Sequence, residues 1–225
     1  SPFVVSDVAV RDSNILPVTA LKEIVAGSKL TGQPYMLVNV RTELRRIEDE
    51  MRNRGYYYFV KENLYFTADT NRTERTVKLE LLLKYGLTDE LKTFKIGDIK
   101  VNTDYELGKT DSVVSYPDSS RRARFTANSS VRPRVISRSI FLKKGETYSR
   151  QNHDMTISRL MGMGTYQFVK IRYIPVDSGD TSYLNVIIEL TPGRRKSIQS
   201  ELDAISKSND FVGPALSFSF LNRNA

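Results

Sequence analysis

The clearest pattern in the chain is an apolar stripe at helical spacing after Gly32. Its members recur at intervals of three or four residues: Val40, Leu44, Ile47 and Met51. Charged side chains occupy most of the positions between them, so the spacing predicts an amphipathic helix over residues 39–54. Gly55 then supplies the left-handed residue at which such a helix ends. Shorter helices are expected over residues 17–26 and 149–163.

Period-two patterns predict two hairpins, one after each of the glycines Gly55 and Gly164. Apolar residues alternate with Lys78 and Glu80 in the first hairpin, and a similar alternation runs through 186–190. Such alternation is typical of a strand that buries one face. The turns are expected at 69–72 and 177–180, where Asp, Asn, Ser and Gly collect. Short β-branched segments at 3–10 and 94–101 each predict one more strand.

These elements belong to an internal repeat. Residues 55–81 align without gaps on residues 164–190 at an offset of 109, with eight identical pairs. Each repeat is therefore β-α-α-β-β, an α+β unit in which two helices cover one face of a three-stranded sheet. The expected units are 1–92 and 93–195. The second contains a polar insertion at about 102–134, which is expected to be a long, partly mobile loop.

Composition excludes several kinds of chemistry. The 225 residues contain no Cys and one His, so disulfides, thiolate zinc sites and histidine-cluster metal sites are impossible. No serine lies in a nucleophile elbow, and Gly162-Met163-Gly164 follows a helix, as a helix cap does, and lacks the third glycine of a dinucleotide loop. We therefore expect no enzyme activity, no catalytic residues, no metal and no cofactor.

The net charge of +8 raises the possibility of nucleic-acid binding. The densest basic run, Arg121, Arg122 and Arg124, lies in the insertion, but the chain has no RNA-binding consensus and no recognition helix. We expect no nucleic-acid partner. A solvated loop is the simplest interpretation of these arginines, and a steering surface for anionic headgroups or an acidic protein is the alternative.

The last residues alternate in a different way. Leu216, Phe218 and Phe220 alternate with Ser217 and Ser219, as in a membrane-barrel strand with apolar side chains toward lipid. One more soluble strand packed on the preceding unit is the alternative. The chain begins without Met and reaches this strand just before it stops, which suggests a fragment of a longer protein.

Several motifs together resemble POTRA domains. The second repeat runs from "KKGETY" through a helix with "RL" to "GTYQFV", and "VIIEL", "GP" and the terminal "NRN" follow. The motif positions are Gly55, Tyr56, Gly145, Tyr148, Gly164, Phe168, Asn222, Arg223 and Asn224. The chain is similar to the periplasmic part of a BamA/TamA-family outer-membrane protein, and most similar to the TamA-like branch of Bacteroides-type bacteria. Residues 196–225 would then be a linker and the first strands of a transmembrane barrel.

The resemblance implies a module on the periplasmic face of the outer membrane, anchored through that barrel. Its partners would be unfolded outer-membrane proteins and periplasmic accessory proteins, bound by β-augmentation at exposed sheet edges. The family's exposed edge corresponds to 61–67 and 170–174, which gives the candidate residues Lys61, Asn63, Leu64, Tyr65, Lys170, Arg172, Tyr173 and Ile174. A secretion porin that exports one dedicated substrate and a spacer scaffold that binds no client are the alternatives.

Overall fold

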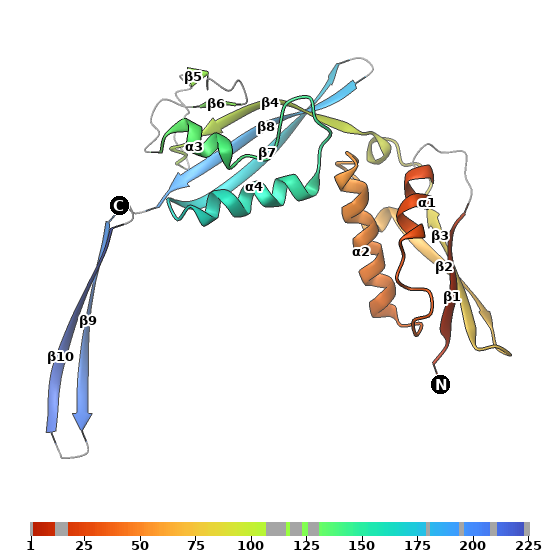
Figure 1. The fold of residues 1–225 in the computed structure, drawn as a ribbon, viewed down its shortest axis with the longest axis horizontal. Helices are drawn as coiled ribbons and strands as arrows, with labels where there is room; N and C mark the ends of the chain where they lie inside the picture. Colours follow the sequence, from red (N-terminus) through yellow and green to blue (C-terminus); the bar gives the residue numbers. More distant parts are fainter. Residues whose placement is uncertain are drawn as a thin grey trace. The chain divides into compact units, whose positions relative to one another are not determined.

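The computed structural model describes residues 2–11, 18–106, 116–117, 123–125, 131–178, 181–193, 196–207 and 211–222. Within these ranges the chain has the α+β architecture that the hydrophobic pattern predicts (Figure 1). The two repeats are each built around a sheet, and a separate hairpin follows them.

The first repeat follows the predicted order of elements. They are β1 (Val4–Val10), α1 (Val18–Ala26), α2 (Leu37–Asn53), the 3-10 turn η1 (Lys61–Asn63), β2 (Leu64–Asn71) and β3 (Thr76–Leu83). The strand order is β1-β3-β2, with β3 parallel to β1 and antiparallel to β2. The centre of the sheet is therefore the second hairpin strand, and β1 and β2 are its two edges.

An apolar cluster joins the two helices to this sheet. Leu21 of α1, Ile47 and Met51 of α2, and Leu81 of β3 are each at most 1% exposed. Met51 and Ile47 belong to the stripe seen in the sequence, and burying a side chain of this size stabilises a fold by about 1.5–3 kcal/mol. The helical periodicity thus identified the buried face of α2 correctly.

The second repeat is larger than predicted. Its elements are β4 (Phe94–Asn102), β5 (Tyr116–Pro117), β6 (Arg124–Phe125), α3 (Pro133–Arg138), α4 (Arg150–Gly162), β7 (Tyr166–Ser178) and β8 (Thr181–Pro192), and a short 3-10 turn, η2 (Asp89–Leu91), precedes them. They form a five-stranded sheet in the order β5-β6-β4-β8-β7.

The prediction of a three-stranded sheet is therefore wrong for the second repeat, whose sheet has five strands. The prediction of a loop at 102–134 is wrong at β5 and β6, which are described parts of the insertion. Residues of the insertion pair with the sheet, because Lys100 and Val101 of β4 align in parallel with Arg124 and Phe125 of β6. The Phe125 side chain is 1% exposed and gives the insertion an apolar anchor. The polar composition of this segment concealed that single buried ring.

One predicted turn is shifted. The first hairpin was expected to turn at 69–72, but β2 continues to Asn71 and the turn occupies residues 72–75. The Asn71 side chain explains the shift, since its Oδ1 accepts hydrogen bonds from the backbone of Thr73 (3.0 Å) and Glu74 (3.2 Å). Asn71 thus starts the turn instead of lying inside it. Of the second predicted turn, Gly179 and Asp180 lie outside the described residues.

The last two strands, β9 (Lys196–Lys207) and β10 (Phe211–Asn222), form an antiparallel hairpin of their own. The alternating residues identified in the sequence lie in β10, and the ring of Phe218 is 72% exposed. Among the described residues, no helix is long and apolar enough to cross a membrane.

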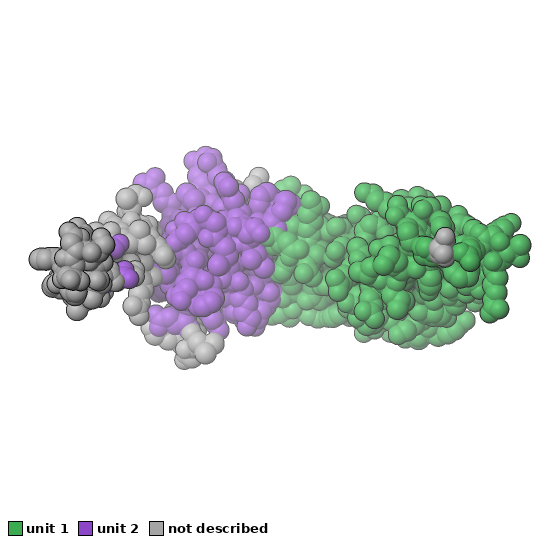
Figure 2. Space-filling model, turned by 90° about the horizontal axis from the view of Figure 1, so that it is seen from below, with its two compact units in different colours: residues 1–98, 142–154, 173–186 green, residues 99–141, 155–172, 187–225 purple. Residues whose placement is uncertain are grey.

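The chain separates into two compact units, which Figure 2 shows in green and purple. The first contains residues 1–98, 142–154 and 173–186, and the second contains 99–141, 155–172 and 187–225. This division passes through β4, α4, β7 and β8, so it does not follow the sequence repeat.

Candidate functional site: the sheet edges

The outer edge of β1 is covered by a neighbouring loop. The backbone of residues 32–35 runs beside this strand and exchanges hydrogen bonds with it. The bonds are Val5 N to Gln33 O (2.9 Å), Gly32 N to Val5 O (2.8 Å) and Tyr35 N to Phe3 O (2.8 Å). These peptide groups are therefore already satisfied, and this stretch of β1 is closed to an incoming strand.

The equivalent strand of the second repeat is covered in the same way. Ile96 N donates to Glu146 O (2.8 Å), Gly145 N donates to Ile96 O (2.8 Å), and Tyr148 N donates to Phe94 O (2.9 Å). Further along β4, strand β6 pairs with it. The covering loop contains Gly145 and Tyr148 of the "KxGxxY" motif, so this motif has a structural role in covering β4.

The opposite edge of the first sheet, β2, is open. Asn63 O accepts a hydrogen bond from Lys84 N at 2.9 Å, and the antiparallel register with β3 continues from that pair. Because bonded and non-bonded positions alternate in such a ladder, Phe66, Ala68 and Thr70 turn their N–H and C=O groups outward. No described residue beyond the sheet forms a backbone hydrogen bond with these three positions.

Leu64 and Tyr65 lie in β2, as the sequence predicted, but Lys61 and Asn63 do not. They belong to η1, so their assignment to the edge strand is wrong. The Asn63 side chain closes this turn, because its Oδ1 accepts a hydrogen bond from Val60 N (2.8 Å) while Asn63 N donates to Val60 O (3.0 Å). Lys61 N is bound by the Glu48 carboxylate of α2 at 3.2 Å. The strand therefore begins three residues later.

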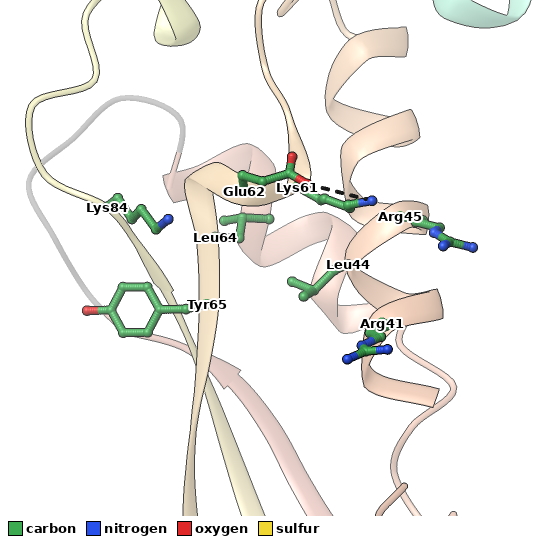
Figure 3. Close-up of a pocket in the computed structure, with 8 residues that line it drawn as sticks. All are labelled: Arg41, Leu44, Arg45, Lys61, Glu62, Leu64, Tyr65 and Lys84. Atoms are coloured by element: carbon green, nitrogen blue, oxygen red, sulfur yellow. Dashed lines mark ion pairs between the residues drawn. The ribbon is translucent and has the colours of Figure 1, made fainter. Parts of the chain in front are cut away.

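A groove lies beside the start of β2. It has a volume of about 450 Å³ and is drawn in Figure 3 with the residues that line it: Arg41, Leu44, Arg45, Lys61, Glu62, Leu64, Tyr65 and Lys84. Leu44 and Leu64 form its apolar part, between α2 and the strand. Arg41 and Arg45 come from one side of α2, and Tyr65 and Lys84 lie on the other side of β2 in this view. Groove residues therefore lie on both sides of the edge strand β2.

The open edge of the second sheet is β7, the last strand in the order. It contains the predicted residues Lys170, Arg172, Tyr173 and Ile174. Arg172 has a second role, because its Nε and Nη2 both donate to Glu189 Oε1, the former at 2.9 Å. The Glu189 side chain is 2% exposed, so Arg172 balances a buried carboxylate and cannot be treated as a simple surface residue.

The side chain of Tyr173 is also engaged within the fold. Its ring packs with Tyr57 (5.3 Å between centroids) and Tyr148 (5.4 Å), and its hydroxyl lies 3.0 Å from His153 Nδ1. Burial raises the pKa of the Tyr173 phenol and lowers the pKa of His153, since both are half-buried in this aromatic cluster. The pair is therefore neutral at pH 7. The observed contacts of this hydrogen-bonded pair are packing contacts within the aromatic cluster.

The remaining motif residues have different roles. Gly55 has φ +100°, and a Cβ there would lie 2.7 Å from Thr147 Cγ2, so only glycine fits. Gly164 also has a positive φ, and Tyr56 packs on the core of the first repeat. Phe168 lies in β7 with its ring 62% exposed, whereas its counterpart in the repeat, Phe59, is fully buried. The repeat alignment therefore does not equate their environments.

The other candidates are only partly described. Arg124 lies in β6, and Arg121 and Arg122 lie outside the described residues. Asn222 is the last residue of β10, and Arg223 and Asn224 are outside as well. In the described part of the chain no group of acidic or histidine side chains could hold a metal ion.

Sequence reasoning missed Arg41 and Arg45 as groove residues. In the sequence they belong to the charged face of the predicted helix, and nothing in their spacing shows which side of that face meets β2. Their four-residue separation does place them on one side of α2, so it was the available signal. The covering loops were also missed, because they carry no periodic pattern.

With the geometry established, the fold can be compared with known structures. The chain is similar to the crystal structure of BamA from Haemophilus ducreyi lacking POTRA domains 1–3, with a TM-score of 0.52 and 14% identity over 90% of this chain and 31% of that one. POTRA domains 3–5 of Haemophilus influenzae BamA give a TM-score of 0.49 at 10% identity, covering 84% of this chain and 61% of theirs. For CdiB from Acinetobacter baumannii the TM-score is 0.30 at 11% identity, covering 91% of this chain and 32% of that one.

No protein-family model and no curated protein sequence matches the chain. The chain spans about a third of the Haemophilus ducreyi structure and about three fifths of the Haemophilus influenzae structure. At these identities the likeness defines a class of fold, and the fold class is α+β with POTRA architecture.

Proposed function

We propose that this chain is the periplasmic module of an outer-membrane protein of the BamA/TamA family. It receives extended segments of unfolded outer-membrane clients, or of accessory proteins, as an added strand on β2 or β7. The observation that carries this proposal is a difference in backbone pairing between the two sides of each sheet. In each repeat other backbone segments cover the outward side of the first strand, β1 or β4, whereas no described residue pairs with the outward side of the first hairpin strand, β2 or β7.

The chemistry of an open edge suits a receiver of varied clients. An unpaired strand offers N–H and C=O groups that any extended peptide can satisfy, because the bonds involve only the main chain. Side chains of the added strand then point alternately to the two faces of the sheet. At β2 one of these faces meets the groove beside α2. The backbone supplies the affinity there and the groove supplies the selectivity.

The finer assignments extend the same proposal. The units 1–92 and 93–195 are the two POTRA domains, the protein belongs to the TamA-like branch, and the module lies on the periplasmic face of the outer membrane. The β9–β10 hairpin begins a membrane barrel. The exposure of Phe218 and its alternation with Ser217 and Ser219 support this last point, since lipid-facing strands alternate in this way.

The edge can be tested at Ala68, whose exposed position turns its N–H outward. Proline at this position removes one outward donor and leaves the bonded positions on either side, Thr67 and Asp69, intact. A photo-crosslinking residue in place of Tyr65 reports the occupancy of the edge by an outer-membrane protein diluted from urea. Losing one hydrogen bond, worth about 1 kcal/mol, should weaken crosslinking about fivefold in Ala68→Pro.

The matched control is Ala68→Val, which adds bulk at the same site and keeps the donor. It should crosslink like the parent chain, and circular dichroism should show both variants folded. Equal crosslinking by the proline variant would refute pairing at β2. Crosslinking to one dedicated secreted substrate and to no outer-membrane client would favour the secretion-porin alternative, and no crosslinking to any unfolded chain would favour the spacer scaffold.

A further inference from the structure

The groove beside β2 carries unbalanced positive charge. Arg41 and Arg45 of α2 and Lys84 after β3 form no ion pair or side-chain hydrogen bond with any described residue. Lys61 reaches Glu62 at 3.6 Å, and this is the only acidic side chain among the lining residues. The lining of the groove therefore combines four basic side chains and one acidic side chain with the apolar surface of Leu44 and Leu64.

Three other basic side chains of the first repeat form ion pairs. Arg11 pairs with Glu80 at 2.6 Å, Arg54 with Glu23 at 2.7 Å, and Lys78 with Asp7 at 3.7 Å. These pairs are all at least partly exposed, so solvent exposure alone does not leave a cation unpaired in this repeat. The groove beside the open edge thus gathers cations that lack the counter-charges these three have.

Glu48, which follows Arg45 by three residues on α2, is already engaged. Glu48 Oε2 accepts the backbone N–H of Lys61 at 3.2 Å, and its Oε1 lies 3.7 Å from Arg52 Nη1. Both carboxylate oxygens of Glu48 therefore already have partners. Arg45 and Arg41, which lie about one and two turns before it, have no acidic partner among the described residues.

We propose that the β2 edge selects extended segments that carry acidic side chains among apolar ones. This inference rests on the proposed function, because it assumes that a strand adds to β2. Such a strand presents alternate side chains to the two faces. On the helix side they meet Leu44 and Leu64, in the groove that Arg41 and Arg45 of α2 also line, and on the other side they meet Tyr65 and Lys84 (Figure 3).

The charge and the apolar floor together define the class of segment. A wholly acidic peptide would leave Leu44 and Leu64 uncovered, and a wholly apolar one would bury the arginines without partners, which is costly. A segment with an acidic residue beside an apolar one satisfies both. Arginine is suited to this role because its planar fork binds a carboxylate through two hydrogen bonds.

The test uses the full chain and three labelled peptides of about ten residues. They share one alternating Thr/Val frame and differ only at a pair of positions that are Glu, Gln or Lys. Fluorescence anisotropy should give the order Glu, then Gln, then Lys in falling affinity. An exposed ion pair contributes a factor of about two to five, so two acidic residues should favour Glu over Gln by about four- to twenty-fivefold at about 0.05 M salt. That ratio should approach one near 1 M salt, where the screening length is about 3 Å.

The decisive variant is Arg41→Gln/Arg45→Gln. It should bring the Glu peptide to the affinity of the Gln peptide and leave binding of the Gln peptide unchanged. The matched control is Lys29→Gln/Arg72→Gln, which removes the same charge from two exposed residues outside the groove, one of them in the turn beyond β2. The control should retain the preference for Glu.

Each result has a definite meaning. Equal binding of all three peptides, lost together in Ala68→Pro, would overturn the acidic preference while the proposed function stands. Binding of no peptide would remove both. A preference for Glu that survives in the Arg41/Arg45 variant would place the selecting charge elsewhere and overturn the inference. Displacement of all three peptides by unlabelled chain, with dimers in solution, would make a second copy the occupant and also overturn it.

Discussion

The pair formed by Arg172 and Glu189 allows a quantitative prediction. Glu189 lies on β8 with 2% of its side chain exposed, and its Oε1 accepts both hydrogen bonds from Arg172 on the edge strand β7. Its other oxygen, Oε2, has no hydrogen-bond partner among the described residues. Replacing Arg172 with Gln therefore leaves a buried carboxylate with little compensation.

The size of the effect follows from the exposure of the two partners. Removing one member of a fully buried ion pair costs about 3–5 kcal/mol, and exposed pairs contribute about 0–1 kcal/mol. The Arg172 side chain is 47% exposed, so water screens one half of this pair. We expect Arg172→Gln to lower the free energy of unfolding by about 2 kcal/mol, between these limits.

A double-mutant cycle isolates the interaction itself. Glu189→Gln should cost about 1 kcal/mol, because it leaves a half-exposed guanidinium that water can solvate, and the double variant should cost little more than that. The coupling free energy should be about 2 kcal/mol. Urea unfolding followed by tyrosine fluorescence and circular dichroism measures each variant, since the chain has twelve tyrosines and no tryptophan.

The first repeat supplies the control. Glu80 is the repeat equivalent of Glu189 and pairs with Arg11, but these side chains are 34% and 57% exposed. The Arg11→Gln/Glu80→Gln cycle should therefore give a coupling of at most about 1 kcal/mol. Additive costs at Arg172 and Glu189, within about 0.5 kcal/mol, would refute the reasoning from burial.

Three further predictions follow from packing and titration. Gly55→Ala should destabilise the fold by about 2 kcal/mol or more, since it combines a positive φ with a Cβ 2.7 Å from Thr147 Cγ2. The control is Gly86→Ala, which has a φ of +80° and no described atom within 4 Å of the added Cβ, and which should cost only about 1 kcal/mol. Equal losses of stability in urea unfolding would contradict this prediction. His153 is the single histidine, and burial lowers its pKa, so the unfolded chain binds the proton more readily and stability should fall as pH drops below about 6.5. NMR titration should find its pKa below that value, and His153→Phe should flatten this part of the pH–stability curve. Thr156→Val should cost about 1–2 kcal/mol, because the hydroxyl of this fully buried residue accepts Phe141 N–H at 3.0 Å, and the exposed Thr42→Val is the control that should change the urea midpoint little.

The hydrophobic pattern predicted the regular elements well. The helix expected over 39–54 is Leu37–Asn53, and the strand expected over 3–10 is Val4–Val10. Periodicity succeeds here because these elements bury one face against one core. The expected POTRA fold class also matches the comparisons.

The errors arise where a single side chain decides the local structure. The side-chain amides of Asn63 and Asn71 bind nearby backbone groups and move the start of β2 and the position of its turn. The buried ring of Phe125 brings part of a polar insertion into the sheet. None of these residues repeats at a fixed period, so pattern analysis cannot weigh them. The candidate edges could be located from the family resemblance, but the loops that close the opposite edges are formed by contacts between distant residues.

The parallel pairing of β1 with β3 has a consequence for the order of folding. Ser6 and Val77, which share a hydrogen bond, are 71 positions apart, whereas β2 and β3 are joined by a turn at residues 72–75. Closing the longer loop costs about 2.5 kcal/mol more in chain entropy, which corresponds to a rate difference of roughly seventyfold. The hairpin therefore forms first, on a scale of about 1–10 µs, and β1 docks late on a surface already built. The first strand of the sequence is in this sense the last strand of the sheet, and its amides should be among the earliest of the sheet to exchange with solvent.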